Sequence, residues 1–446
     1  MADTNKAAAE SGTPPGRAAD NTSPYGFDTL QVHAGTAPDP VTGARSTPIY
    51  QTTAFVFEDA DQAASLFNLQ SFGNIYTRLT NPTTAVLEQK VAALENGRAA
   101  TAVATGHASQ LVAFHMLMSP GDHIVASSKL YGGSITQLGV SFQRFDWHTT
   151  FVDPDDLAGF EKAITPKTRA IYAESLSNPG GVIADIAALA GIAHRNGIPL
   201  IIDNTMASPY LCRPIEHGAD IVLHSATKFL GGHGNSMGGV IVDSGKFDWG
   251  QNDKFPHLSK PSPAYHGLTF WETFGDMAFA VACRVISLRD LGPAISPFNA
   301  FMILTGMETL SLRMRKHCDN ALAVAEFLSK HPRVAWVNYA GLPGDKHHKL
   351  AQRYLPKGAG SVFTFGLKGG YEAGLKFVDT VQIFSHLANV GDTRSLVIHP
   401  ASTTHRQLSP EQRTAAGSGD DVIRLSIGIE DVADLIKDLD RALNAV

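Results

Sequence analysis

The fold is decided by residues 199–228, PLIIDNTMASPYLCRPIEHGADIVLHSATK. The runs 199–203 and 221–224 are short and apolar, which is the pattern of buried strands. Strands of this kind that alternate with helical segments predict parallel β–α units in a sheet covered on both faces. Ligands bind beyond the carboxyl ends of such strands. The polar residues at these two ends, Asp203 and residues 225–228, are therefore where we look for chemistry.

The same rhythm extends to both sides of this stretch. Further strands are predicted at 99–104, 123–127, 169–173 and 239–243, and helices at 83–95, 108–118, 157–164 and 186–195. Asp153 is the expected cap of the third helix, and Gly197 ends the fourth. We therefore predict a large α/β domain over residues 83–292, with a mostly parallel sheet covered by helices.

The remaining segments are predicted to differ from this domain. Residues 246–277 lose the periodicity, and their aromatic content favours an ordered segment. Residues 293–446 form a smaller α/β domain, with helices at 298–308, 312–331 and 431–443 and strands at 361–367 and 422–427. Residues 1–24 are small, polar and rich in Pro and Gly, so we expect a disordered extension.

Composition excludes several classes of function. The net charge of -6 has no basic stripe, so nucleic-acid binding is not expected. Three scattered cysteines argue against a disulfide framework and favour a reducing, cytoplasmic setting. No apolar run is long enough to span a membrane, and the N-terminus lacks the apolar core of a signal peptide. The histidines show no spacing typical of a metal site, so no metal is expected.

The strongest local signal is Ser225-Ala226-Thr227-Lys228, which ends a strand and precedes the glycines of residues 231–234. In a Walker loop the lysine follows the glycines, whereas Lys228 precedes them, so a Walker loop is excluded. A partly desolvated lysine loses its proton more easily and can form an imine with an aldehyde cofactor. Ser225 and Thr227 would then hold the cofactor's phosphate. The alternative is a surface lysine in a mobile loop.

Asp203 ends a neighbouring strand and so lies at the same edge of the sheet. A pyridoxal cofactor needs an anion beside its ring nitrogen, because the protonated ring accepts negative charge from the substrate. Asp203 fits this requirement. An ordinary turn or cap aspartate is the alternative, and the combination with Lys228 favours the cofactor.

Weaker signals lie at other strand ends. Gly106 and His107 join a strand to a helix, where backbone N–H groups can approach an anion, although a capped turn has the same pattern. Tyr131 could stack on a flat ring or belong to the core. Asn178 could contact a ring hydroxyl or make a turn. Arg424 could hold a carboxylate in two-point fashion or form a surface ion pair.

Together these motifs resemble the fold type I pyridoxal-phosphate enzymes of cysteine and methionine metabolism, from about Phe27 to Val446. The matching segments are 76–78 (YTR), 81–83 (NPT), 105–106 (TG), 130–132 (LYG), 177–179 (SNP), 203–205 (DNT), 225–228 (SATK), 399–402 (HPAS) and 424–430 (RLSIGIE). The ordered combination is far more specific than any single motif. The resemblance implies a fold type I transferase that carries pyridoxal 5'-phosphate.

The resemblance also implies a role for each site residue. Lys228 would bond the cofactor and move protons, and Tyr131 would stack on the ring as the second catalytic residue. Asp203 would pair with the ring nitrogen and Asn178 with the ring's oxygen side. The phosphate would be bound by Gly106, His107 (through its backbone N–H), Ser225 and Thr227, and by Tyr76 and Arg78 of a neighbouring subunit. Arg424, helped by Asn389, would hold the substrate's carboxylate.

A shared site makes a dimer obligatory, and the resemblance implies a homotetramer. Residues 25–82 would be the arm that reaches the neighbouring subunit's site. The aromatic stretch after Gly239 and residues 389–395 (NVGDTRS) resemble members that exchange the acetate of O-acetyl-L-homoserine for sulfide or methanethiol. Homocysteine or methionine would then be the product.

Three alternatives stay open. One is a related γ-synthase or a succinyl-using sulfhydrylase, and another is a lyase that cleaves cystathionine or methionine. The last is a non-catalytic binding protein in which Lys228 is structural. Methionine γ-lyases have a cysteine where this chain has Gly133, which favours replacement over lysis. Many relatives have Met at His107 and Ser at Asn389, and these differences bear on the shape of the substrate pocket.

Overall fold

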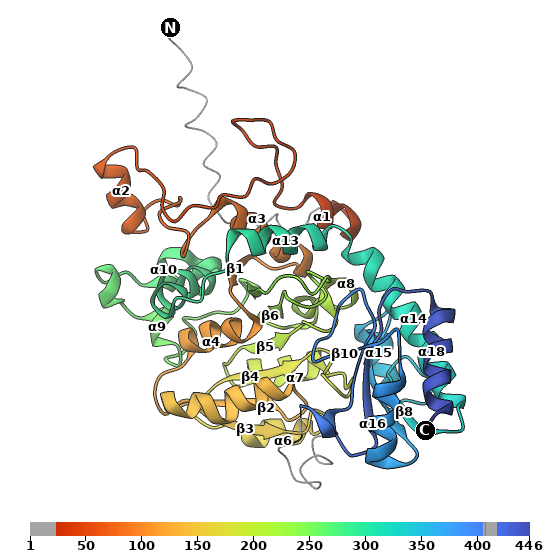
Figure 1. Cartoon of the computed structure of the whole chain (residues 1–446). Coiled ribbons are helices and arrows are strands. Elements are labelled where there is room, and N and C mark those ends of the chain that lie inside the picture. Colours follow the sequence, from red (N-terminus) through yellow and green to blue (C-terminus); the bar gives the residue numbers. More distant parts are fainter. Residues whose placement is uncertain (1–23, 405, 407–416) are drawn as a thin grey trace.

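A computed structural model describes residues 24–404, 406 and 417–446, so the predicted extension 1–24 lies outside the described residues except for its last position. A seven-stranded sheet dominates the molecule, in the order β1-β7-β6-β5-β4-β2-β3 (Figure 1). Its strands are β1 Ala99–Val103, β2 His123–Ser127, β3 His148–Val152, β4 Thr168–Glu174, β5 Leu200–Asp203, β6 Ile221–Ser225 and β7 Gly239–Asp243.

The sheet is mostly parallel, which confirms the predicted fold class. β3, β2, β4, β5 and β6 pair in parallel, whereas β7 pairs antiparallel with both β6 and β1. A parallel neighbour needs a crossover connection, usually a helix. The link between β6 and β7, residues 226–238, contains Lys228 and no helix, and β7 returns antiparallel. The half-exposed strand β3 was not predicted, because HTTFV has no apolar run.

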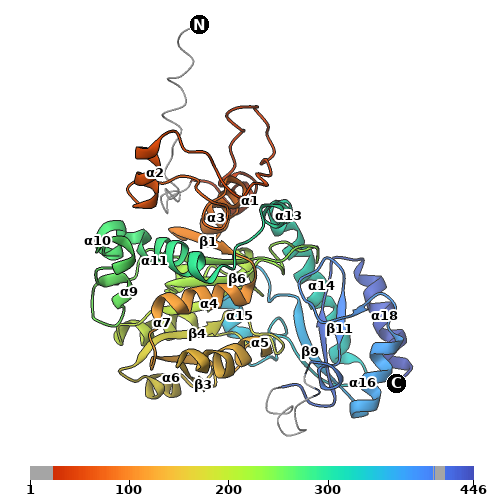
Figure 2. The same ribbon diagram turned by 60° about the vertical axis from the view of Figure 1, so that its left-hand side comes forward.

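Helices flank this sheet (Figure 2). The main ones are α3 Pro82–Glu95, α4 Gly106–Leu117, α6 Leu157–Ala163 and α7 Ile186–Arg195, and short ones are α5 Gly132–Thr136, α8 Ser208–Leu211, α11 Ala278–Ala282 and α12 Arg289–Leu291. The predicted cap of α6 is wrong. Asp156, not Asp153, accepts a hydrogen bond from the Gly159 N–H at 2.8 Å, because it directly precedes the first helical turn.

A second, five-stranded sheet lies beside the first, in the order β10-β11-β12-β9-β8. Its strands are β8 Val334–Asn338, β9 Val362–Leu367, β10 Ser385–His386, β11 Leu396–Ile398 and β12 Val422–Ser426. Its helices are α14 Leu310–Lys330, α15 His348–Tyr354, α16 Gly370–Thr380 and α18 Val432–Asn444, with α13 Pro297–Met307 leading in from the first sheet. Helix α18 buries Leu435, Leu439 and Leu443 on one face, which packs it against α14 and α16.

The N-terminal segment stands away from both sheets. Helices α1 Phe27–His33 and α2 Ala60–Phe67 are joined by long loops that project from the body (Figures 1 and 2). Val41 is 90% exposed and Val56 is 99% exposed. Isolated apolar side chains on a surface are common, but several on one projecting segment are typical of a contact surface.

Residues 246–277 are ordered, as predicted. They contain the short helices α9 Pro256–Ser259 and α10 Phe270–Phe274. Trp249 and Phe255 are buried, and the indole of Trp249 stacks on Phe279 with the ring centroids 5.2 Å apart. These aromatic side chains anchor the segment in the core.

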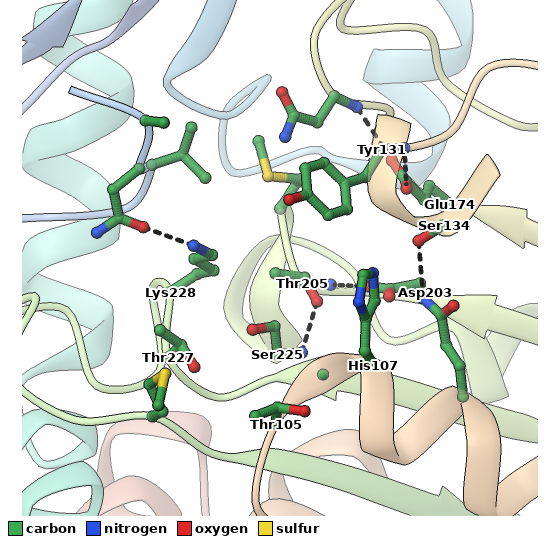
Figure 3. A pocket seen from close by; sticks show the side chains of 18 of the residues that line it. Thr105, His107, Tyr131, Ser134, Glu174, Asp203, Thr205, Ser225, Thr227 and Lys228 are labelled. Carbon is green, nitrogen blue, oxygen red and sulfur yellow. Dashed lines mark hydrogen bonds between the residues drawn. The ribbon is translucent and has the colours of Figure 1, made fainter. Parts of the chain in front are cut away.

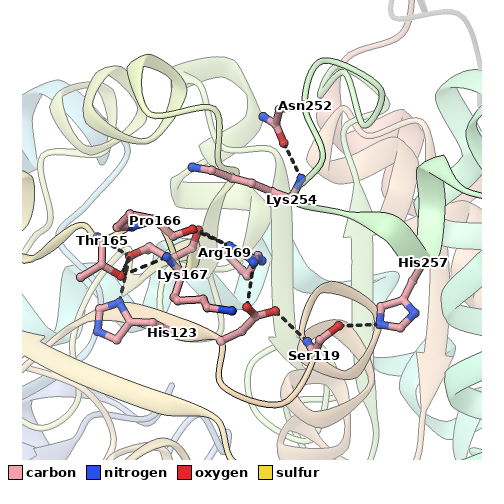
Figure 4. A network of polar contacts seen from close by, with 11 residues as sticks. Ser119, His123, Thr165, Pro166, Lys167, Arg169, Asn252, Lys254 and His257 are labelled. Carbon is pink, nitrogen blue, oxygen red and sulfur yellow. Dashed lines mark hydrogen bonds and ion pairs between the residues drawn. The ribbon is translucent and has the colours of Figure 1, made fainter.

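Polar contacts fix the outer side of the same segment (Figure 4). Lys254 Nζ donates to the carbonyl of Asn196 at 2.6 Å, and Asn252 Nδ2 donates to that of Gly197 at 2.9 Å. His257 lies 3.2 Å from the hydroxyl of Ser119. All three partners precede the amino ends of β2 or β5. The segment therefore lies at the edge of the sheet opposite Asp203.

Candidate active site

A cavity of about 340 Å³ lies at the carboxyl edge of the first sheet (Figure 3). All predicted site residues except Tyr76 and Arg78 line it, namely Gly106, His107, Tyr131, Asn178, Asp203, Ser225, Thr227, Lys228, Asn389 and Arg424. The structure thus brings together residues separated by more than three hundred positions, because the strand ends of one sheet face a loop and a strand of the other.

Lys228 sits in the turn that follows β6, and its amine points into the cavity. Nζ donates to Oδ1 of Asn389 at 2.5 Å. Burial lowers the pKa of Lys228 below its ordinary value, and the positive charge of Arg424 lowers it further. A lower pKa favours the uncharged amine, which is the form that attacks an aldehyde.

Asp203 is the last residue of β5 and is buried. Its Oδ1 accepts the N–H of Thr205 at 2.9 Å, and its Oδ2 accepts the hydroxyl of Tyr172 at 3.4 Å. These two hydrogen bonds fix the orientation of the carboxyl group at the base of the cavity.

The turn between β1 and α4 forms a cradle for an anion. The Thr105 hydroxyl caps α4 by accepting the Ala108 N–H at 3.1 Å. Gly106 lies against Ser225, since a Cβ at position 106 would come within 2.7 Å of Ser225 Cβ. The glycine lets the helix N-terminus, with its free N–H groups and positive dipole end, approach the serine closely. The Thr227 hydroxyl lines the same cavity.

Tyr131 follows β2 and is half exposed, with its ring centroid 5.8 Å from that of His107. The Tyr131 N–H donates to Glu174 Oε1 at 2.7 Å, and the Asn178 N–H donates to Glu174 Oε2 at 3.0 Å. The loops that carry the Tyr131 ring and the Asn178 amide are thereby tied by their backbones to one carboxylate.

Arg424 comes from β12 of the second sheet. Nη1 donates to Oδ1 of Asn178 and Nη2 donates to the carbonyl of Asn389, both at 3.2 Å. Burial lowers the pKa of Arg424 to about 10, so the guanidinium stays charged at neutral pH. The site thus contains a fixed cation that can receive a carboxylate.

Tyr76 and Arg78 are not brought into this cavity. Tyr76 is 43% exposed, and the guanidinium of Arg78 lies 5.4 Å from the centroid of its ring. Both belong to the segment that precedes α3. Their predicted contact with a neighbouring subunit stays a prediction.

Seven lining residues escaped the sequence analysis: Gln110, Ser134, Glu174, Met206, Met237, Ala388 and Thr404. Thr105, Thr205 and Val390 also line the cavity; they lie in the matching segments but were given no role. Glu174 had a signal, because it ends an apolar strand as Asp203 does. Gln110 and Ser134 had none, since a polar residue one turn inside a helix is common on any surface.

Known proteins resemble the chain over nearly its whole length. A family model described as Cys/Met metabolism PLP-dependent enzyme matches residues 28–444. The chain belongs to this family. Its members depend on pyridoxal 5'-phosphate, so the predicted cofactor and the predicted resemblance are confirmed.

Individual relatives cover the chain almost completely. An O-acetyl-L-homoserine sulfhydrylase of Leptospira meyeri is 53% identical over 94% of this chain and 97% of its own length. A homocysteine/cysteine synthase of Saccharomyces cerevisiae is 45% identical over 95% and 98%. A crystal structure from Campylobacter jejuni, which carries N'-pyridoxyl-lysine-5'-monophosphate, matches with a TM-score of 0.92 and 41% identity over 94% and 100%.

The cavity fits the family's cofactor. It presents an amine with a lowered pKa, a buried carboxylate and the glycine cradle that a Cβ would fill. Gln110 also lines the cavity, and within the described residues its buried Oε1 has no hydrogen-bond partner.

Within residues 24–404, 406 and 417–446, no helix is both long enough and apolar enough to cross a bilayer. In the same residues no group of three or more His, Cys, Asp or Glu side chains is placed to hold a metal ion.

Proposed function

We propose that this chain is an O-acetylhomoserine sulfhydrylase, which replaces the acetate of O-acetyl-L-homoserine by sulfide, or by methanethiol, to give homocysteine or methionine. The observation that carries the proposal is the meeting of the Lys228 amine, the Asp203 carboxylate and the Arg424 guanidinium in one cavity. The names of the relatives from Leptospira meyeri and Thermus thermophilus, both O-acetyl-L-homoserine sulfhydrylases, support this substrate.

We assign the cofactor to residues of the first sheet. Lys228 would hold its aldehyde carbon, Asp203 would pair with its ring nitrogen and Tyr131 would cover one ring face. Its phosphate would be bound by Gly106, His107, Ser225 and Thr227, and Asn178 would contact its ring oxygen. When bound, pyridoxal 5'-phosphate supplies a ring that stores negative charge from the substrate's carbon atoms.

The chain's own residues would then bind the substrate and move its protons. Arg424 would hold the amino acid's carboxylate, with Asn389 beside it, so that the α-carbon faces Lys228. The uncharged Lys228 amine would take the α-proton and return it later. Acetate leaves from the γ-carbon, and the sulfur of the second substrate bonds to the same carbon. Acylation makes the leaving oxygen a weak base, which explains why the substrate is an ester.

We also propose that residues 83–292 form the cofactor domain, residues 293–446 the smaller domain and residues 25–82 an arm. Tyr76 and Arg78 on this arm would complete the phosphate site of a neighbouring subunit, and the assembly would be a homotetramer built from such dimers. The exposed apolar residues of the arm, among them Val41 and Val56, support a buried role in an assembly. Cys212, Cys283 and Cys318 are buried free thiols, which supports the cytoplasmic location that we propose.

The reaction is tested by feeding the purified protein O-acetyl-L-homoserine with and without sulfide. We expect homocysteine and acetate only when sulfide is present. Release of 2-oxobutyrate and ammonia without sulfide would instead identify a lyase. A parallel assay with O-succinyl-L-homoserine separates the two acyl donors.

Lys228→Ala tests the cofactor assignment. We expect a folded, colourless and inactive protein, because the bond between the amine and the cofactor gives the protein its yellow colour. The wild-type protein should lose this colour on treatment with borohydride. A Lys228→Ala protein that stays yellow after dialysis would contradict the assignment.

A further inference from the structure

We propose that Glu174 is a positioning residue of this site. Its carboxylate ties the loop that carries Tyr131 to the loop that carries Asn178 and, through Asn178, sets the orientation of Arg424. This inference rests on the proposed function, because it concerns how the amino-acid substrate is held.

Glu174 is the last residue of β4, lines the cavity and is only 6% exposed. Figure 3 shows its side chain below the backbone of Tyr131. Its Cα is paired in register with that of Asp203 on β5. Two acidic side chains therefore lie at neighbouring strand ends of the same cavity. None of the roles assigned above uses Glu174.

Both oxygens of Glu174 are committed to backbone donors. Oε1 accepts the Tyr131 N–H at 2.7 Å and Oε2 accepts the Asn178 N–H at 3.0 Å. A carboxylate is the side chain that can accept two such bonds in different directions without donating any. A buried N–H that loses its acceptor costs free energy, so both bonds matter to the position of their loops. One side chain thus joins a loop that follows β2 to a loop that follows β4.

The connection continues from Asn178 into the second sheet. Asn178 Oδ1 accepts Nη1 of Arg424, and the other arm of the guanidinium donates to the main chain of Asn389. The Asn389 side chain in turn accepts the Lys228 amine. The backbone anchored by Glu174 therefore determines where the Arg424 guanidinium can meet a carboxylate.

Burial raises the pKa of Glu174 well above its ordinary value, and the negative charge of Asp203 raises it further. A buried carboxylate beside a second one destabilises the protein unless other contacts compensate. Because its two oxygens already serve backbone donors, Glu174 does not have a free atom for the reacting carbons. We therefore assign it positioning and not acid–base chemistry.

The test compares Glu174→Gln with Glu88→Gln. Glu88 is the control, since it is also buried and accepts a backbone N–H, that of Ala102 at 2.8 Å, but does not line the cavity. Its other oxygen pairs with Arg284 at 2.8 Å, so Glu88→Gln also weakens an ion pair. In Glu174→Gln the amide NH₂ faces one of the two N–H donors, so one bond is lost. We expect the KM for O-acetyl-L-homoserine to rise roughly tenfold or more, from the typical cost of a buried N–H left without an acceptor.

The same variant should keep its KM for sulfide, and kcat should fall less than KM rises. The circular-dichroism band of the bound cofactor should change, because the Tyr131 ring shifts. Glu88→Gln should lower the melting temperature without altering either KM or this band. A Glu174→Gln protein that melts earlier but keeps its KM and its cofactor band would overturn the proposal.

Glu174→Asp decides the question if the glutamine variant does not fold. Its shorter carboxylate keeps the charge and reaches only one of the two N–H groups, so a smaller rise in KM is expected, and an unchanged KM would refute the inference. Failure of the proposed function is recognised separately. If the wild-type protein makes no homocysteine, spectral titration of its cofactor band with L-homoserine still measures carboxylate binding in both variants.

Discussion

At the residue scale, Asn389 connects two basic side chains within one cavity. Its side-chain oxygen accepts the Lys228 amine, and its main-chain oxygen accepts the Arg424 guanidinium. The two side chains differ in what burial does to them. The lysine is driven towards its neutral form, whereas the arginine stays charged at neutral pH because its pKa falls only to about 10. One group can therefore move protons while the other holds an anion.

Arg424→Lys should weaken binding of the amino acid. A lysine ammonium cannot donate to Asn178 and Asn389 and also offer a two-point fork to a carboxylate. We expect the KM for O-acetyl-L-homoserine to rise about 10- to 100-fold, as typical for a lost charge-assisted contact, with a smaller effect on the KM for sulfide. Steady-state kinetics measures both constants. Arg315, an exposed arginine that pairs with Asp28, serves as a control. Arg315→Lys should change neither constant.

Residues at strand ends could be predicted from the sequence for a physical reason. An apolar run that stops at Asp203 or shortly before Lys228 indicates a buried strand, and its end places the polar residue at the carboxyl edge of the sheet. Gln110 and Met237 could not be predicted this way, since their place in the cavity depends on how helices and loops pack. Tyr76 and Arg78 show a further limit, because the chain alone does not bring them to the cavity.

At the element scale, strands and helices with a strong apolar pattern were predicted within one or two residues. The strands β3, β8, β10 and β11, which have short or partly exposed sequences, were not predicted. The helices α1, α2, α15 and α16 were not predicted either. Such strands exist because a neighbour supplies their hydrogen bonds, which no local pattern reveals. The direction of β7 also depends on tertiary structure, because the link 226–238 that contains Lys228 has no helix to carry the chain back across the sheet.

Trp249→Ala tests whether residues 246–277 support the fold and not the reaction. The indole is buried between Phe255 and Phe279, so removing it should cost about 3–5 kcal/mol of unfolding free energy, as for other buried aromatic truncations. Both KM values should stay unchanged at a temperature where the variant is folded. Trp336→Ala, at a side chain that is 38% exposed, should cost less. A raised KM with normal stability would assign the segment to the site.

At the scale of the whole molecule, the projecting N-terminal segment predicts that sites are shared between chains. We expect a mixture of two inactive variants, Lys228→Ala and Arg78→Ala, to regain activity. In a mixed dimer, the site that combines the Lys228→Ala chain with the arm of the Arg78→Ala chain has both defects. The other site combines an intact Lys228 with an intact Arg78 and has neither defect. Random pairing of equal amounts would leave about a quarter of all sites intact.

Co-refolding and assay of the mixture measure this recovery. The matched control mixes Lys228→Ala with Asp203→Asn, whose defects lie on the same chain's side of the cavity. That mixture should stay inactive. Mixed oligomers of the first pair that show no activity would mean that each chain completes its own site.

Because Arg424 belongs to β12 while Lys228 follows β6, neither half of the chain is a minimal catalyst. A fragment that stops before the second sheet would retain the groups proposed to anchor the cofactor. It would lack Arg424, and so could not bind the carboxylate that distinguishes amino acids from other amines. A shortened or split protein would therefore lose its selectivity for amino acids before it loses the colour of the bound cofactor.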